Sequence, residues 1–237
     1  TSVNGYLINT GAKLVLVDAG AGAFFGPTLG KLTANLQASG YQPAQVDEIY
    51  ITHLHVDHVG GLVTNGERAF PNATVRVSKA DADFWLSEQK MEAAPAEMKD
   101  FFKGAMAALK PYIAANKFKP FDGDAAELSP GIAALPTNGH TPGHHSYEVT
   151  SGAQKLLLIG DLIHVAAVQL DDPSVTIAFD VDPNAAAAIR KQIFTRAANE
   201  GTPIGASHIA FPGLGHLREV GNGYHWMPLN FTQMNPK

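Results

Sequence analysis

The sequence contains the stretch Thr52-His53-Leu54-His55-Val56-Asp57-His58-Val59-Gly60-Gly61, in which four potential metal ligands occupy six positions. Residues 46–51, directly before it, form an apolar run that predicts a buried β-strand. The four side chains therefore lie on the loop where that strand ends, which is where α/β proteins place much of their chemistry. Imidazole and carboxylate groups bind Zn²⁺, Mn²⁺, Fe²⁺ or Co²⁺. A metal site explains this density of ligands better than surface or capping histidines do.

Three later residues repeat the pattern of a ligand placed after a strand. The apolar runs at 131–135, 155–159 and 203–206 are followed by His140, Asp161 and His208. All seven candidate ligands can then converge on one edge of a sheet. The natural partition gives one metal His53, His55 and His140, and a second metal Asp57, His58 and His208, with Asp161 bridging the two. Two cations about 3.5–4 Å apart need such an anionic bridge.

The order His-x-His-x-Asp-His, then His, Asp and His, resembles the metallo-β-lactamase superfamily. Six further stretches outside the ligands resemble its methyl parathion hydrolase branch and the lactone- and aryl-ester-cleaving relatives of that branch. They are FGPTLG at 25–30, GYQP at 40–43, ADFWLS at 82–87, FFKGAM at 101–106, VAAVQLDDPS at 165–174 and FPGLGH at 211–216. The resemblance implies an α/β fold, an αββα sandwich, formed by residues 1–237 as one domain. It also implies two divalent metal ions, zinc before manganese, cobalt or iron, and a homodimer.

Composition narrows the class of partner. Seventeen Lys and Arg residues against 22 Asp and Glu residues give a net charge of −5, which argues against a nucleic-acid substrate. The absence of cysteine excludes disulfides and thiolate ligands. No apolar run reaches the roughly 20 residues of a membrane span, so no membrane partner is expected. The family has an earlier N-terminal segment that we expect to be missing here, and localisation stays open between a secreted or periplasmic and a cytoplasmic protein.

Local patterns predict alternating strands and helices. Asp18, at the end of the second strand, is a candidate acceptor for the N–H of a ligand histidine. The expected strands are a hairpin of Tyr6–Asn9 with Leu14–Val17, and residues 72–78. The expected helices cover residues 27–39, 79–89 and 97–115, the last bent or split at Pro111, and residues 183–199 with Asp182 as N-cap and Gly201 as the stop.

Two metals would acidify a bridging water to a hydroxide that attacks a carbonyl or phosphoryl group. We expect Asp57 to accept a proton from this nucleophile while it remains a ligand. His164, three residues after Asp161, is expected to donate to the leaving oxygen or to orient a bound carboxylate. The expected walls of the substrate pocket are Phe25, Trp85, Phe102, Phe179 and His164.

His164 and Phe179 also bear on the substrate, because phosphotriester-specialised relatives are expected to carry smaller or apolar side chains at these positions. A flat ester or lactone fits a narrow pocket better than a phosphorus with three substituents. The sequence therefore predicts a small-molecule hydrolase that cleaves aromatic lactones of the dihydrocoumarin type and aryl esters, with organophosphate triesters as secondary substrates. The alternatives are a methyl parathion hydrolase-type phosphotriesterase, an acyl-homoserine lactonase, and a non-hydrolytic di-metal redox or scaffold protein.

Overall fold

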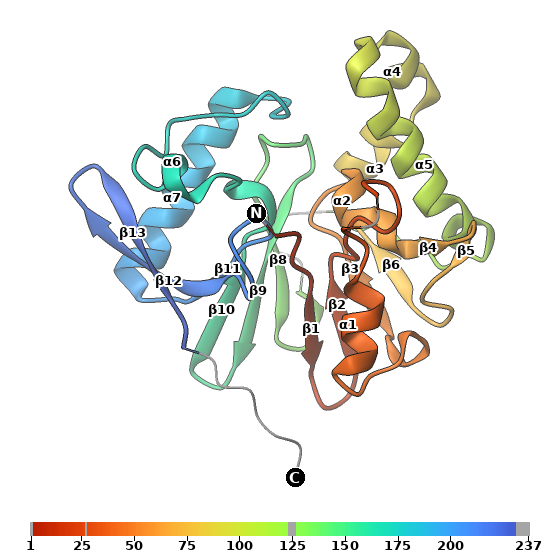
Figure 1. The fold of residues 1–237 in the computed structure, drawn as a ribbon, viewed down its shortest axis with the longest axis horizontal. Helices are drawn as coiled ribbons and strands as arrows, with labels where there is room; N and C mark the ends of the chain where they lie inside the picture. The colour runs from red at the N-terminus through yellow and green to blue at the C-terminus, as the bar shows by residue number, and fades with distance from the viewer. Residues whose placement is uncertain (1, 27, 123–126, 231–237) are drawn as a thin grey trace.

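The computed structural model describes residues 2–26, 28–122 and 127–230, and these form two facing sheets with helices outside them (Figure 1). The four-stranded sheet has the order β1 (Tyr6–Asn9), β2 (Leu14–Val17), β3 (Glu48–Tyr50), β6 (Thr74–Arg76). The seven-stranded sheet has the order β13 (Gly223–Pro228), β12 (Leu214–Val220), β11 (Ile204–Gly205), β10 (Gln154–Leu158), β9 (His145–Ser151), β8 (Ile132–Pro136), β7 (Glu127–Ser129). The short strands β4 (Val63–Thr64) and β5 (Glu67–Arg68) pair with each other.

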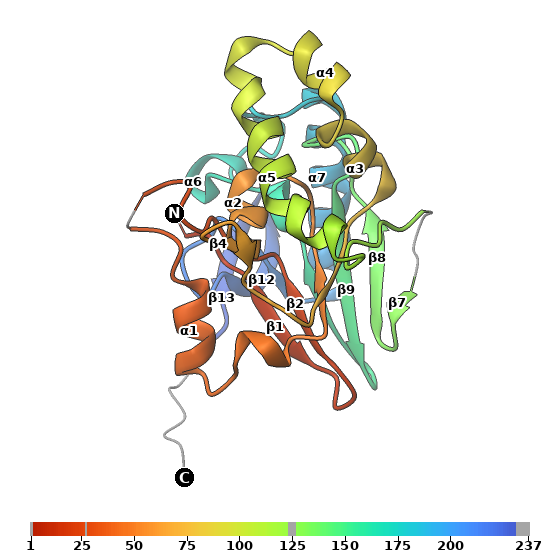
Figure 2. The same cartoon turned by 90° about the vertical axis from the view of Figure 1, so that its right-hand side faces the viewer.

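The helices cover the outer faces of both sheets. Against the four-stranded sheet lie α1 (Leu32–Ala38), α2 (Val56–Val59), α3 (Lys79–Trp85) and α5 (Lys99–Ala114), and α4 (Glu88–Ala93) packs on α3 and α5. Against the other sheet lies α7 (Pro183–Glu200), with α6 (Ala166–Gln169) nearby. Single 3₁₀ turns are η1 (Pro43–Gln45), η2 (Gly60–Leu62), η3 (Ala96–Met98) and η4 (Gly160–Leu162). Both views show α4 projecting beyond the end of the sandwich (Figures 1 and 2).

The sandwich follows from strands that are apolar on both faces. In β2, Leu16 faces the helical core while Val15 and Val17 pack between the sheets. In β3, Ile49 faces the helical core and Tyr50 packs between the sheets. Successive side chains of a strand point to opposite faces, so a strand with no polar face must be covered on both sides. The predicted αββα sandwich is therefore confirmed.

The predicted elements agree with the structure best where a local signal marks an end. The hairpin has the predicted bounds, and α7 starts after Asp182 and ends at Gly201, whose φ is 63°. The predicted helix 27–39 is too long, because Gly30 has a φ of 76° and the helix starts only at Leu32; its Pro27 lies outside the described residues. The helix predicted over 79–89 is divided at Ser87, which caps α4, whereas Pro111 lies inside an unbroken α5.

Strands β9, β12 and β13 were not predicted, because their polar residues hide the alternation. In the part of the chain that the structure describes, no helix is long and apolar enough to cross a membrane.

The cap of α7 can be tested directly. The Asp182 carboxylate accepts a hydrogen bond from the Ala185 N–H at 3.0 Å. Asp182→Ala should lower the free energy of unfolding by about 1 kcal/mol, because one N–H of the first turn loses its acceptor. Asp182→Ser keeps an acceptor and should stay near the wild type. Urea denaturation measures both, and an alanine variant as stable as the wild type would contradict the role of this cap.

Candidate metal centre

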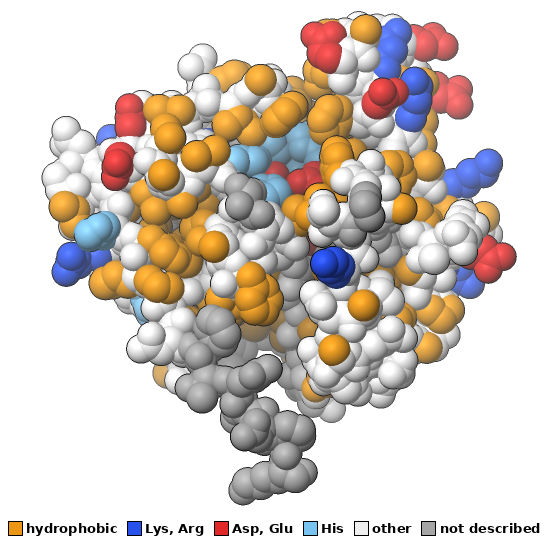
Figure 3. All heavy atoms as spheres, viewed as in Figure 1, with side chains coloured by type: hydrophobic (Ala, Val, Ile, Leu, Met, Phe, Trp, Pro, Cys, Tyr) orange, Lys and Arg blue, Asp and Glu red, His pale blue; other side chains and the backbone are white. Residues whose placement is uncertain are grey.

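The seven predicted ligands meet at one end of the sandwich, where strands from both sheets stop. Four of them follow β3, and the others follow β8, β10 and β11. The space-filling view shows histidine and acidic side chains at the bottom of a hollow, with apolar side chains around it (Figure 3). The fold thus brings together residues that lie up to 155 positions apart in the sequence, from His53 to His208.

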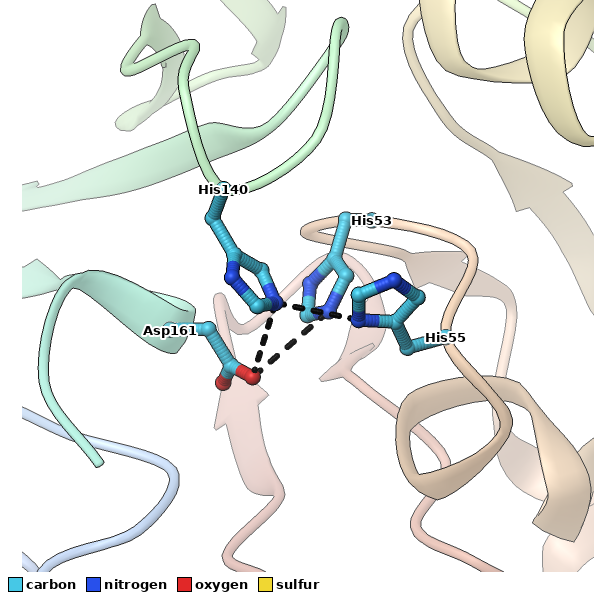
Figure 4. A group of neighbouring side chains, drawn as sticks. All are labelled: His53, His55, His140 and Asp161. Atoms are coloured by element: carbon cyan, nitrogen blue, oxygen red, sulfur yellow. Dashed lines mark hydrogen bonds and ion pairs between the residues drawn. The ribbon is translucent and has the colours of Figure 1, made fainter. Parts of the chain in front are cut away.

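The ligand atoms form two groups in which all atoms lie within 4.8 Å of one another. One group is His53, His55, His140 and Asp161; the other is Asp57, His58, Asp161 and His208. These are the two sets that the sequence predicted, and Asp161 belongs to both. Figure 4 shows the first group, with His140 and Asp161 on one side and His53 and His55 on the other.

The atoms in these two groups are placed better as ligands of a cation than as hydrogen-bond partners of one another. Among the described residues, the buried atoms His53 Nε2, His58 Nε2 and Asp161 Oδ1 make no hydrogen bond of normal geometry, although some lie close together. The Asp161 carboxylate lies 3.1 Å from His58 Nε2, 3.2 Å from His208 Nε2 and 3.4 Å from His140 Nε2. Ligands bound tetrahedrally to zinc at about 2.0–2.2 Å are separated by roughly 3.3–3.6 Å. The residues present therefore fit two divalent cations that share Asp161.

The backbone around Asp161 has little freedom. Gly160 has a φ of 54°, and a Cβ added there would lie 2.6 Å from His144 Nε2, so a larger residue does not fit. The His144 ring accepts the Asp161 N–H at 3.0 Å through Nε2, and its Nδ1 lies 2.8 Å from the Thr137 hydroxyl. The His144 ring therefore helps to fix the residue that both groups share.

Two further carboxylates orient ligand histidines. Asp18 Oδ2 accepts from His58 Nδ1 at 2.8 Å, which confirms the predicted contact of Asp18 with a ligand ring. Asp180 Oδ1 accepts from His140 Nδ1 at 2.8 Å. In each case the Nε2 atom is left to face the cluster, and an anionic acceptor makes the ring a stronger ligand.

The protonation of the histidines differs across the cluster. Burial lowers the pKa of His53 and His55 well below the usual range, so both rings are neutral and offer a lone pair. Burial also lowers the pKa of His140, but hydrogen bonds with Asp161 and Asp180 outweigh it and raise the value to about 9. Metal binding at His140 must therefore displace a proton.

Asp81 is a buried residue of the site that the sequence did not reveal. Its carboxylate accepts the Leu54 N–H at 2.7 Å and the Gly143 N–H at 2.9 Å. It therefore joins the loop of His53 and His55 to the loop of His140, and burial raises its pKa to about 6. The sequence does show Ser78 three residues before Asp81, a spacing typical of a helix N-cap, and Ser78 caps α3. That spacing predicts a contact within the first turn of α3, and it does not predict the contacts of Asp81 with Leu54 and Gly143.

The predicted pocket walls need a correction. Phe25 and Phe179 are exposed at 50% and 57%, but Trp85 and Phe102 are fully buried. Trp85 packs behind the His55 ring at 5.0 Å, and Phe102 packs on Trp85 at 4.6 Å. The side chains of α5 that share a face with Phe102, namely Ala105, Leu109 and Tyr112, are buried with it.

Phe101, the neighbour of Phe102, points toward the site instead. Its ring lies 5.1 Å from the His55 ring and 5.9 Å from that of Phe179, which comes from the other half of the chain. The structure thus replaces two of the predicted wall residues with Phe101.

The two predicted proton carriers lie beside the cluster. Asp57 Oδ2 is 3.4 Å from His208 Nε2, and its side chain is 21% exposed. His164 Nε2 is 3.0 Å from Asp161 Oδ2, and its ring stacks on that of His208 at 5.1 Å. Both side chains contact the ligand cluster, and their catalytic roles stay predictions.

Residues 1–211 match the metallo-beta-lactamase superfamily, and the chain belongs to this family. The structure is similar to a hydrolase of the beta-lactamase superfamily, AbOPH, with a TM-score of 0.92 and 41% identity over 98% of this chain and 81% of that one. It is also similar to AidC, a dizinc quorum-quenching lactonase solved with a product, with a TM-score of 0.87 and 30% identity over 96% and 79%.

A curated N-acyl homoserine lactonase from a Bacillus species is 32% identical over 161 residues, which is 60% of this chain and 55% of that protein. The match thus spans little more than half of that relative's length.

The shared role of Asp161 predicts what its removal does. Wild-type protein dialysed against buffered zinc should hold about two ions per chain, whereas Asp161→Ala should hold fewer than about one, since both groups lose a ligand. Elemental mass spectrometry measures the ratio. Asp172→Ala, an exposed carboxylate in the segment that follows, is the control and should bind as the wild type does. Two retained ions in Asp161→Ala would refute the shared ligand.

Because Asp18 and Asp180 each orient a histidine of a different ligand group, substituting either one should weaken metal binding at one group only. Asp18→Asn should weaken the ion beside His58, and Asp180→Asn the ion beside His140, each by about 10- to 100-fold. Competition with chelators of graded affinity resolves the two binding steps. If both variants weaken the same step, the assignment of one carboxylate to each group is wrong.

Proposed function

We propose that this protein is a dinuclear metal-dependent hydrolase that opens lactones and cleaves aryl esters, with aromatic lactones of the dihydrocoumarin type as preferred substrates. One observation carries the proposal: two histidine-rich ligand groups share the Asp161 carboxylate at the bottom of a hollow with an apolar rim. The lactonases among the relatives support the lactone class. Zinc is the proposed metal, since it suits imidazole and carboxylate donors.

The proposed chemistry assigns a task to each group of side chains. Two bound cations would acidify a water molecule and polarise the substrate carbonyl. Asp161 holds the two ligand groups in register, and the partly exposed Asp57 accepts the proton of the attacking water. His164 contacts Asp161 and is the more exposed of the two, and it donates to the alkoxide or phenolate that leaves.

The rim supports a substrate with an apolar group. Phe25 and Phe179 are half exposed, and Phe101 joins Phe179 to the ring of His55. Aromatic rings of this kind favour stacked or edge-on contact with another ring. A fused aromatic lactone presents such a ring and a flat carbonyl together.

N-acyl homoserine lactones are the second candidate, and the lactonases among the relatives favour them. In this case the rim would hold an acyl chain. Cleavage of organophosphate triesters, expected from the resemblance to the methyl parathion hydrolase branch, is proposed as a secondary reaction by the same nucleophile. The homodimer expected from that resemblance is part of the proposal.

The test is a comparison of kcat/KM on zinc-reconstituted protein for dihydrocoumarin, phenyl acetate, N-hexanoyl and N-decanoyl homoserine lactone, and methyl parathion. We expect dihydrocoumarin to lead by about tenfold or more, consistent with an aromatic contact of about 1–1.5 kcal/mol. Phe179→Ala should raise KM for dihydrocoumarin about tenfold. Ile113→Ala, which removes an exposed apolar side chain of α5, is the control and should leave KM unchanged.

Each alternative has its own outcome. A lead for the decanoyl substrate would assign the protein to acyl-homoserine lactones, and a lead for methyl parathion would make it a phosphotriesterase. Absence of turnover on all five substrates by protein that holds two zinc ions would overturn the proposed hydrolysis.

A further inference from the structure

Arg190, on the inner face of α7, is fully buried near the metal centre. Its Nε donates to Leu162 O at 2.5 Å, and its Nη1 donates to Pro173 O and to Val175 O, both at 2.8 Å. Among the described residues, every hydrogen bond of this guanidinium ends on a backbone carbonyl and none on a carboxylate. A buried cation without a paired anion is costly, so bonds from a charged donor to several carbonyls are its main compensation.

Gln169, at the end of α6, is buried beside the same carbonyls. Its Oε1 accepts the N–H groups of His164 at 2.7 Å and Val165 at 3.0 Å. Its Nε2 donates to Val175 O at 3.1 Å, which is the acceptor that Arg190 also uses. Gln169 and Arg190 therefore connect the same two stretches of chain.

The first stretch runs from Asp161 to Val165 and carries the shared carboxylate. The second stretch runs from residue 173 to residue 182 and holds His140. Asp180 accepts the Ile177 N–H at 3.1 Å and the His140 Nδ1–H at 2.8 Å. The Val181 N–H donates to His140 O at 3.0 Å. The distance between the two stretches therefore sets where the His140 ring lies relative to Asp161.

We propose that Arg190 and Gln169 act as a clamp that positions Asp161 against His140, and so fixes the geometry of the ligand group that contains both. Leu162 lies directly after Asp161, and Val175 lies two residues before the backbone that Asp180 holds. The planar guanidinium has donors at fixed angles that reach both carbonyls at once, whereas an ammonium group does not. Arg190 and Gln169 touch no reacting atom, and they are positioning residues.

Two substitutions test the clamp. Arg190→Lys keeps the positive charge but loses the planar set of N–H donors. Gln169→Glu keeps the acceptor but loses the donor to Val175 O. The readouts are the visible absorption of the cobalt-substituted protein, chelator competition for each ion, and kcat and KM for dihydrocoumarin. We expect an altered cobalt spectrum, an affinity about 10- to 100-fold lower for one ion, and a similar fall in kcat with little change in KM.

Arg196→Met is the matched control. It removes a guanidinium from the same helix, but one that pairs with Glu148 and Glu200 on the outer surface. This variant should lose some stability and keep the wild-type spectrum and affinities.

Folded variants of Arg190 and Gln169 with wild-type spectra and affinities would overturn the proposal. So would a failure of both to fold, because that result would assign the two residues to stability alone. The kinetic readout rests on the proposed function, but the spectrum and the affinities do not. A protein that binds cobalt as predicted and opens no lactone would therefore refute the function and leave the clamp standing.

Discussion

The structure depends on one carboxylate, Asp161, that two groups of histidines share. Oδ1 lies nearest to His58, whereas Oδ2 lies within 3.6 Å of His53, His140 and His208. A single buried anion cannot compensate so many imidazoles, since unsatisfied buried polar atoms cost about 1–3 kcal/mol each. The centre is therefore a locally unfavourable arrangement that the rest of the fold holds in place. Because cations would relieve it, metal binding should also stabilise the folded state.

The segments around the metal centre hold the ligand residues in that arrangement. The fixed loop at Gly160 and the ring of His144 hold Asp161 itself. Asp81 joins the first ligand loop to the loop of His140 across the two halves of the chain. At the other side, the Asn4 amide donates to Ala206 O at 3.0 Å and Ile209 O at 2.8 Å, on both sides of His208. Each ligand loop is thus tied to a neighbouring segment by buried hydrogen bonds.

The sequence was sufficient where a function needs residue types at fixed local spacing. The ligands could be predicted because four lie in one loop and the others follow apolar strands, and α7 could be predicted from Asp182 and Gly201. Arg190 and Asp81 could not, because their partners are backbone groups distant along the chain that carry no sequence signal. Gln169 could not either, because its partners, although only four to six residues away, are backbone groups of an irregular loop. Phe101 and Phe102 show the same limit: adjacent aromatic residues point about 100° apart on a helix, and only the packing of α5 decides which one is buried.

The ligand groups and the rim differ in how strongly the fold constrains them. The ligand rings are buried, and those of His53, His58, His140 and His208 bond to a hydroxyl, a carboxylate or a carbonyl. A substitution near them therefore disturbs metal binding before it alters the choice of substrate. Phe25 and Phe179 are half exposed, so their side chains can change with little effect on the core. Phe101 lies between these regimes, because it touches both the ring of His55 and that of Phe179. Specificity within this family fold should therefore vary at the rim, while the chemistry stays with the shared carboxylate.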